Sequence, residues 1–136
     1  MLEPRKTKFR KQHKGVGGGK KSRGTDLSIG QYGLKAMEDG IMSARQIEAV
    51  RQVLSRATKK GGKLWIRVFP DRPITFKGTE VPMGGGKGDV TGYEVPVRSG
   101  KILFELDGID TIQAKETFRL ASHKLGIKTK FITRSL

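Results

Sequence analysis

The positive charge of this chain is large, and it limits what the chain can fold into. The sequence has 28 Lys and Arg residues against 13 Asp and Glu residues among 136, which gives a formal net charge of +15. Self-repulsion on this scale opposes a compact state unless a polyanion neutralises it. Nucleic acid is therefore the first candidate partner, and an anionic membrane surface is the second.

More than half of the excess charge lies at the N-terminus. Residues 1–24 contain nine basic residues and one acid, so they carry +8, while residues 25–136 carry +7. Sizeable apolar residues are scarce in the first segment, which alone cannot bury enough surface to offset its ordering entropy. We predict a basic extended N-terminal arm, residues 1–24, that orders on RNA, and a single domain, residues 25–136. The predicted RNA-binding residues of the arm are Arg5, Lys6, Lys8, Arg10, Lys11, His13, Lys14, Lys20, Lys21 and Arg23.

Two other interpretations of the arm are weaker. A tail that only keeps the protein soluble would not need charges of one sign clustered together. A transit peptide would form an amphipathic helix, which Glu3, Pro4 and the glycine cluster at 15–19 disfavour. The longest apolar runs have three residues, so we expect neither a membrane span nor a secretory signal core.

The composition also excludes several kinds of chemistry. Without cysteine and with only two histidines, the chain cannot form disulfides or thiolate zinc sites and has little for His-based catalysis. Asp71, Asp107 and Asp110 stand at turns or a helix start, where turn and cap roles account for them. His123 is expected to face solvent near a helix C-terminus. We therefore expect no enzyme activity, no metal and no cofactor.

Residues 43–60 predict an amphipathic helix with a basic outer face. Ser43 and Gln46 have the spacing of a capping box, and apolar residues recur at helical spacing from Ile47 to Ala57. The glycines at 61–62 follow the helix and end it. The other face carries a single acid, Glu48, and we predict that its cations form a second RNA-binding surface. These cations are Arg45, Arg51, Arg56, Lys59 and Lys60.

The remaining pattern favours an α+β domain, a compact mixed sheet with two helices. A second helix is predicted from Asp110 to Gly126, and the predicted strands cover 27–29, 64–69, 74–77, 92–98, 101–106 and 128–133. Several of these strands carry aromatic residues, which either stack on unpaired bases or fill the core. We favour the core for these residues, Trp65, Phe69, Tyr93 and Phe104.

A glycine-rich loop lies between two predicted strands. Neither this loop nor the glycine cluster at 15–22 has the spacing and strand–helix context of a nucleotide-binding Walker A loop. Glycines with one lysine still allow the backbone to approach a polyanion closely. We predict close contact with RNA or tRNA here, and a flexible hairpin connection is the alternative. The loop residues are Met83, Gly84, Gly85, Gly86, Lys87 and Gly88.

Several stretches, in this order, resemble the bacterial and organellar ribosomal protein L-sixteen family. The most specific are PRKTKFRKQHKG at 4–15 and GGKLWIRVFPDRP at 61–73. Further matches are Met1-Leu2, 32–36, 44–49, 83–84 with 86–88, and 124–125 with 127–131. Together these stretches span the whole chain.

The resemblance implies a hammerhead-type α+β domain, shared with the archaeal and eukaryotic L-ten-e proteins, and a structural role in the large ribosomal subunit. It implies binding to 23S ribosomal RNA between the peptidyl-transferase region and the base of the stalk. There the family helps to organise the A-site, lies near A- and P-site tRNAs, and joins late in assembly. It further implies neighbouring large-subunit proteins as partners, with the 5S ribosomal RNA region as another candidate. We expect no membrane and no homo-oligomer.

The sequence departs from the family pattern in places. Pro82 replaces an arginine that some members hydroxylate, so we predict no such modification there and a weaker contact. Gly85 replaces a common lysine, which removes another charge. Gly78 and Gly126 stand where proline is frequent, which bears on the rigidity of those turns.

The combined interpretation is a non-enzymatic ribosomal constituent in the cytoplasm, with an organellar ribosome as a second setting. A free-standing RNA-binding or RNA-chaperone module is the alternative function. The charge by itself indicates RNA, whereas the ribosome follows from the resemblance.

Overall fold

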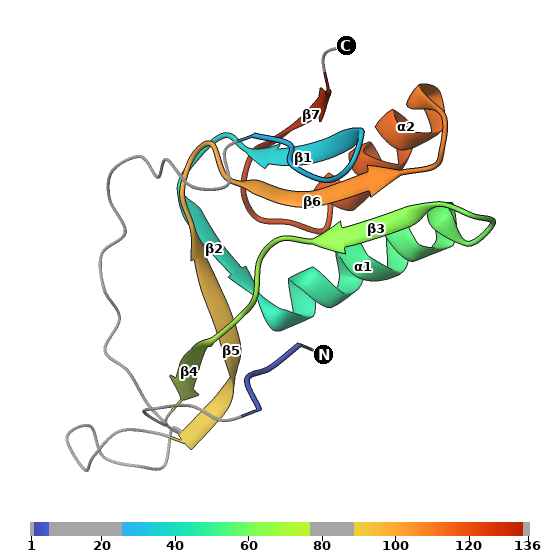
Figure 1. The fold of residues 1–136 in the computed structure, drawn as a ribbon. Coiled ribbons are helices and arrows are strands. Elements are labelled where there is room, and N and C mark those ends of the chain that lie inside the picture. The colour runs from blue at the N-terminus through green and yellow to red at the C-terminus, as the bar shows by residue number, and fades with distance from the viewer. Residues whose placement is uncertain (1, 6–25, 77–88, 135–136) are drawn as a thin grey trace.

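The computed structural model describes residues 2–5, 26–76 and 89–134 (Figure 1). The elements, in chain order, are β1 (Tyr32–Ala36), β2 (Gly40–Ser43), α1 (Ala44–Thr58), β3 (Lys63–Ile66), β4 (Arg72–Phe76), β5 (Asp89–Val97), β6 (Ile102–Asp107), α2 (Thr111–Ser122) and β7 (Thr129–Thr133). Predictions for residues 6–25 and 77–88 lie outside the described residues. No helix in the described part of the chain is long and apolar enough to cross a membrane.

The α+β class is confirmed, but the strands form two antiparallel sheets and not one mixed sheet. The larger sheet has the order β3-β6-β1-β7 and the smaller one β2-β5-β4, with antiparallel pairing at every described strand contact. Among the described strands, only β4 and β5 are paired neighbours that follow each other in the chain, and the other four pairs join strands that are not consecutive. The chain passes from one sheet to the other after β1, β2, β3 and β5 (Figure 1).

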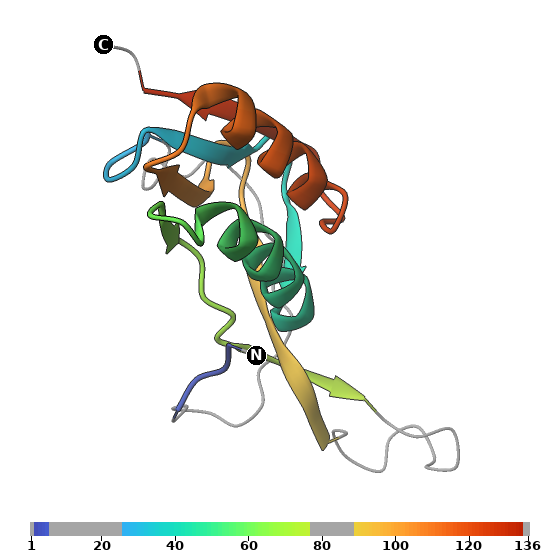
Figure 2. The same ribbon diagram turned by 90° about the vertical axis from the view of Figure 1, so that its right-hand side faces the viewer.

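The two helices lie side by side on one face of the larger sheet (Figure 2). They are antiparallel: the Gln113 side-chain amide in α2 donates to the Ala57 carbonyl near the end of α1, at 3.3 Å. Between helices and sheet lies the hydrophobic core. Its largest fully buried side chains include Phe104, Phe118, Leu34, Met42, Ile47, Leu54 and Leu106.

The helix starts form as the sequence predicts. Gln46 donates its backbone N–H to Ser43 Oγ at 3.2 Å, and Ser43 returns an N–H to Gln46 Oε1 at 2.9 Å, which completes the capping box. Asp110 accepts from the Gln113 N–H at 2.7 Å and caps α2. The end of α2 differs, because the helix stops at Ser122 with His123 as C-cap. It is therefore shorter than the predicted span to Gly126.

The strand predicted at 27–29 is wrong, and β1 and β2 are additional strands. Residues 26–31 form an irregular segment that crosses the larger sheet at Glu105. Gly33 stands opposite Glu105 in the β1–β6 register, where its missing side chain makes room for Leu27. The segment therefore covers the sheet face opposite the helices.

Glu105 fixes this segment through a buried carboxylate. Its Oε1 accepts the backbone N–H groups of Ser28, Ile29 and Gly30 at 3.2, 3.1 and 3.0 Å. Its Oε2 accepts from the Arg67 guanidinium at 2.9 Å. A side chain at Gly30 would meet the Leu106 carbonyl at 2.7 Å, so the close approach requires glycine.

Burial raises the pKa of Glu105, but the N–H groups of Gly30 and Ile29 and the Arg67 guanidinium act in the opposite direction and prevail. The net pKa is lower than that of an ordinary glutamate. The carboxylate is therefore held in its charged form although it is fully buried.

We expect Glu105→Gln to lower the free energy of unfolding by about 3 kcal/mol, because it leaves Arg67 facing an uncharged partner in a buried site. Urea unfolding at neutral pH measures this loss. Glu116→Gln is the matched control, since its ion pair with Arg119 is more than half exposed and exposed ion pairs contribute little to stability. Equal losses in the two variants would contradict the structural role of Glu105.

The same carboxylate predicts an acid dependence of stability. Because the pKa of Glu105 is lowered by folding, its contribution is complete above the ordinary carboxyl pKa of about 4.3 and is lost as pH falls through the lower folded value. We expect the unfolding free energy of Glu105→Gln to fall less between pH 6 and pH 3 than that of the unsubstituted protein. Parallel pH profiles would refute this assignment.

Candidate nucleic-acid interface

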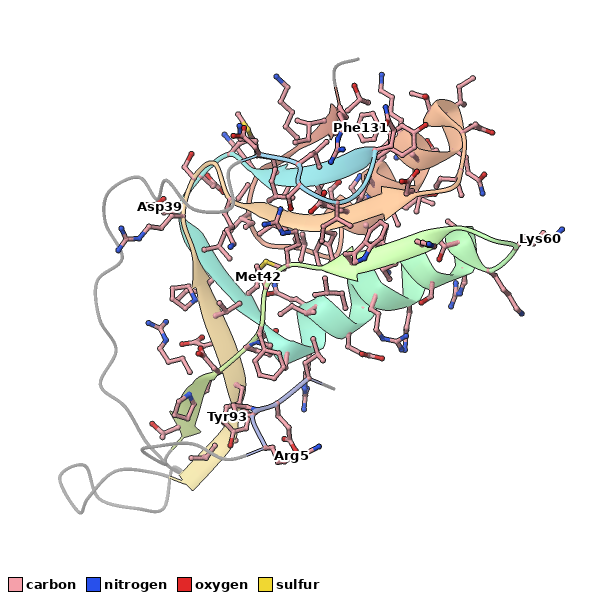
Figure 3. The ribbon with its side chains drawn as sticks, in the orientation of Figure 1. Arg5, Asp39, Met42, Lys60, Tyr93 and Phe131 are labelled. Atoms are coloured by element: carbon pink, nitrogen blue, oxygen red, sulfur yellow. The ribbon has the colours of Figure 1, made fainter. Side chains whose placement is uncertain are left out.

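The solvent face of α1 is basic. Helical geometry places Arg45, Gln52 and Arg56 opposite the buried Ile47, Val50 and Leu54. Arg45 and Arg56 are exposed, as are Lys59 and Lys60 beyond the helix end, and Figure 3 shows Lys60 at the outer tip of the molecule. Among the described residues, no carboxylate forms an ion pair with any of these four cations.

Arg51 differs from the other cations of α1. Its guanidinium Nε donates to Glu48 Oε2 at 2.9 Å, and this hydrogen bond lowers the pKa of Glu48 and raises that of Arg51. Arg51 also lies on the flank of the helix, beside Leu64 and Trp65 of β3. The local acid therefore offsets its charge, and the free basic surface of α1 consists of Arg45, Arg56, Lys59 and Lys60.

Most acidic side chains of the described residues are engaged within the fold. Some accept guanidinium hydrogen bonds, namely Glu48, Glu94, Glu105 and Glu116. Others accept backbone N–H groups. Glu38 accepts the N–H of Lys128 and Asp39 that of Ser99. Asp107 accepts the N–H of Gly108 and Asp110 that of Gln113. The surface therefore presents cations whose charge is not compensated locally.

A second buried ion pair holds β4 against β5. Arg72 and Glu94 stand opposite each other in the register, and the Arg72 guanidinium donates to Glu94 Oε1 at 2.8 Å. The two side chains are only 13% and 9% exposed. These strands lead to and from residues 77–88, and the ion pair stabilises the end of their ladder away from that segment, whereas Phe76 and Asp89 are paired at the near end.

The described residues that flank the stretch 6–25 contact the domain on both sides. Leu2 packs against the hydrophobic core, and Arg5 lies exposed in the same part of the molecule as Tyr93 (Figure 3). At the other side, Arg67 donates to the Asp26 carbonyl at 3.2 Å, and Glu105 binds residues 28–30. Described residues on both sides of the charged stretch 6–25 therefore contact the domain.

Many predicted contact residues lie outside the described residues: Lys6, Lys8, Arg10, Lys11, His13, Lys14, Lys20, Lys21, Arg23 and the loop from Met83 to Gly88. The four aromatic residues predicted to lie in the core differ in burial. Phe104 is fully buried, as predicted, and Trp65 and Tyr93 are half-buried. The core prediction is wrong for Phe69, which is 46% exposed because β3 ends at Ile66 and the chain leaves the sheet there.

The exposed position of His123 at the α2 C-terminus is confirmed. Among the described residues, no three His, Asp or Glu side chains converge where they could share a metal ion. The two buried ion pairs were not found from the sequence. Glu105 alone carried a signal, because it interrupts the apolar run 102–106.

The fold and the surface together define the class of small, basic α+β proteins that bind a polyanion through cations without a local counterion. Comparison with known proteins makes the assignment specific. The family model described as "Ribosomal protein L16p/L10e" matches residues 4–132.

Among the most similar relatives are proteins named "Large ribosomal subunit protein uL16" from Xanthomonas oryzae pv. oryzae (strain PXO99A), Xanthomonas euvesicatoria pv. vesicatoria (strain 85-10) and Xanthomonas axonopodis pv. citri (strain 306). Each is 51% identical over 136 residues, which covers 100% of this chain and 99% of the relative. The chain belongs to the ribosomal protein L16p/L10e family, which confirms the resemblance seen in its sequence.

We expect Arg72→Met to destabilise the protein by about 3 kcal/mol, because it leaves the Glu94 carboxylate buried without its partner. The double variant Arg72→Met/Glu94→Met removes both charges and should be less destabilised than the single one. Urea unfolding of both variants measures the difference. A double variant that loses more stability than Arg72→Met alone would contradict this account of the pair.

Proposed function

We propose that this protein is a non-catalytic structural constituent of the large subunit of the cytoplasmic ribosome, where it binds 23S ribosomal RNA. The observation that carries the proposal is the set of uncompensated cations on α1, on a chain that belongs to a ribosomal protein family over residues 4–132. Each cation that meets a phosphate releases condensed counterions, which supplies affinity without reading sequence. Neighbouring large-subunit proteins are further partners.

The basic arm, residues 1–24, contributes the larger share of this charge. Because both sides of residues 6–25 are attached to the domain, RNA would order a closed segment and not a free tail. In general, a segment held at both ends has fewer accessible conformations than a free one, so ordering it on RNA would cost less entropy. The remainder, residues 25–136, would act as one domain that holds the arm in place.

The glycine-lysine loop, Met83 to Gly88, would approach RNA or tRNA through its backbone near the peptidyl-transferase centre. Support comes from its position between β4 and β5, which are paired with each other and carry the buried Arg72–Glu94 ion pair at the far end of their ladder. In this position the protein would help to organise the A-site and lie near A- and P-site tRNAs. Addition late in assembly is part of the same proposal, as the family resemblance implies.

We expect Arg45→Gln/Arg56→Gln to weaken binding to 23S ribosomal RNA and to reduce the slope of log K against log salt by about 1.5, since two phosphate contacts are lost. The matched control is Glu48→Gln/Arg51→Gln, which keeps the net charge on the same helix and should leave the slope unchanged. Filter binding between 50 and 300 mM salt measures both variants. Equal slopes in both double variants would remove the α1 face from the interface.

We expect Gln substitution of the eight cations from Lys6 to Arg23 to reduce the salt slope by at most about 6, the effect of eight lost contacts on a single strand. The variant retains residues 1–5, because truncation would also remove Leu2 from the core. Its unfolding free energy should be unchanged or higher, since like charges repel less. An unchanged salt slope with an intact fold would exclude the arm from RNA binding.

A further inference from the structure

A groove runs between α1 and α2 on the side away from the sheet. Its volume is about 500 Å³, within the range of clefts that hold small molecules in proteins, roughly 300–1,000 Å³. Val53 and Ala57 of α1 and Leu120 of α2 supply apolar surface. Leu120 is 44% exposed, so this surface is available to an apolar partner group.

Cations border the same groove. Arg56 of α1 and Lys124 after α2 line it and are exposed, as is His123. None of the described lining residues is acidic. The groove on the other side of α2 differs, because an acid, Glu116, lines it together with Lys115 and Arg119 and forms an ion pair with Arg119.

The polar groups inside the groove do not favour base-specific recognition. The Thr117 hydroxyl donates to the Gln113 carbonyl at 2.7 Å and is already satisfied. The lining therefore offers an apolar surface for the flat face of a ring and positive charge for the groups attached to that ring. This combination suits one nucleotide, with an apolar base face and phosphates on both sides.

We propose that the groove between α1 and α2 holds an unpaired nucleotide of the ribosomal RNA. The base lies on Val53, Ala57 and Leu120, and the flanking phosphates lie on Arg56 and Lys124. Paired RNA does not fit this description, because its bases stack inside the helix and expose only their edges in the grooves, not a ring face. The inference rests on the proposed function and adds the kind of RNA feature that the domain recognises.

The direct test replaces Leu120, in the full chain, with a photoreactive phenylalanine analogue and adds the protein to large subunits from which it has been removed by a salt wash. The same replacement at Ile112 is the control, since Ile112 lies on α2 outside the groove and is 83% exposed. After irradiation, reverse transcription maps cross-linked nucleotides. We expect cross-links from position 120 to one short unpaired stretch of 23S ribosomal RNA, at least tenfold above those from position 112.

A substitution series gives a second readout. We expect Leu120→Glu to weaken binding to the salt-washed subunits at least tenfold and Ile112→Glu less than threefold, although both introduce one negative charge on α2. Lys124→Ala compared with Lys115→Ala repeats the contrast without adding an acid to the helix. Thermal unfolding of each variant separates misfolding from loss of contact.

The outcomes separate this inference from the proposed function. If the unsubstituted protein does not rejoin the subunits, both the proposed function and the groove assignment are wrong. If it rejoins them while position 120 cross-links to a neighbouring protein, to paired RNA, or no more than position 112, only the groove assignment is overturned.

Discussion

The structure depends on carboxylates that are held inside the fold. Glu105 is fully buried, yet it stays charged because three backbone N–H groups and Arg67 bind it. Glu94 is similarly buried and binds Arg72 across the smaller sheet. Removing either partner would leave a charge without solvent or a counterion, which is far more costly than never burying the pair. Glu105 therefore holds residues 28–30 against the larger sheet, and Glu94 links β5 to β4.

This use of acids explains how a chain with a net charge of +15 can be compact and still bind RNA. Among the described residues, the acids that cap helices, hold loops and pair with arginines are placed within the fold, so the cations Arg45, Arg56, Lys59 and Lys60 lie outside without local compensation. Repulsion between those cations weakens the free protein, and RNA phosphates relieve it. Folding and RNA binding thus draw on the same distribution of charge.

The sequence was sufficient for those parts of the fold that local interactions decide. Ser43 with Gln46 and Asp110 with Gln113 predicted the helix starts, and the apolar stripe of α1 predicted its buried face. The irregular segment 26–31 could not be predicted, because Glu105, more than seventy residues away, binds its N–H groups. Hydrophobic alternation at 27–29 was a weaker influence than this long-range contact.

The candidate site also has features that the local sequence predicts and features that depend on long-range contacts. Helical periodicity was enough to predict that Arg45 and Arg56 face solvent. It could not predict the Arg72–Glu94 pair, since cross-strand register depends on which strands meet. The groove between α1 and α2 was likewise hidden, because it exists only once the two helices lie antiparallel (Figure 2).

The central claim is that this protein belongs stably to the large ribosomal subunit. Sedimentation of a gently prepared cell lysate through a sucrose gradient, with quantitative detection of the protein in each fraction, tests it most directly. We predict that the protein sediments with large subunits and whole ribosomes, at about one copy per large subunit. Recovery mainly as free protein, or with diverse messenger RNAs, would contradict the account and favour a free-standing RNA-binding module.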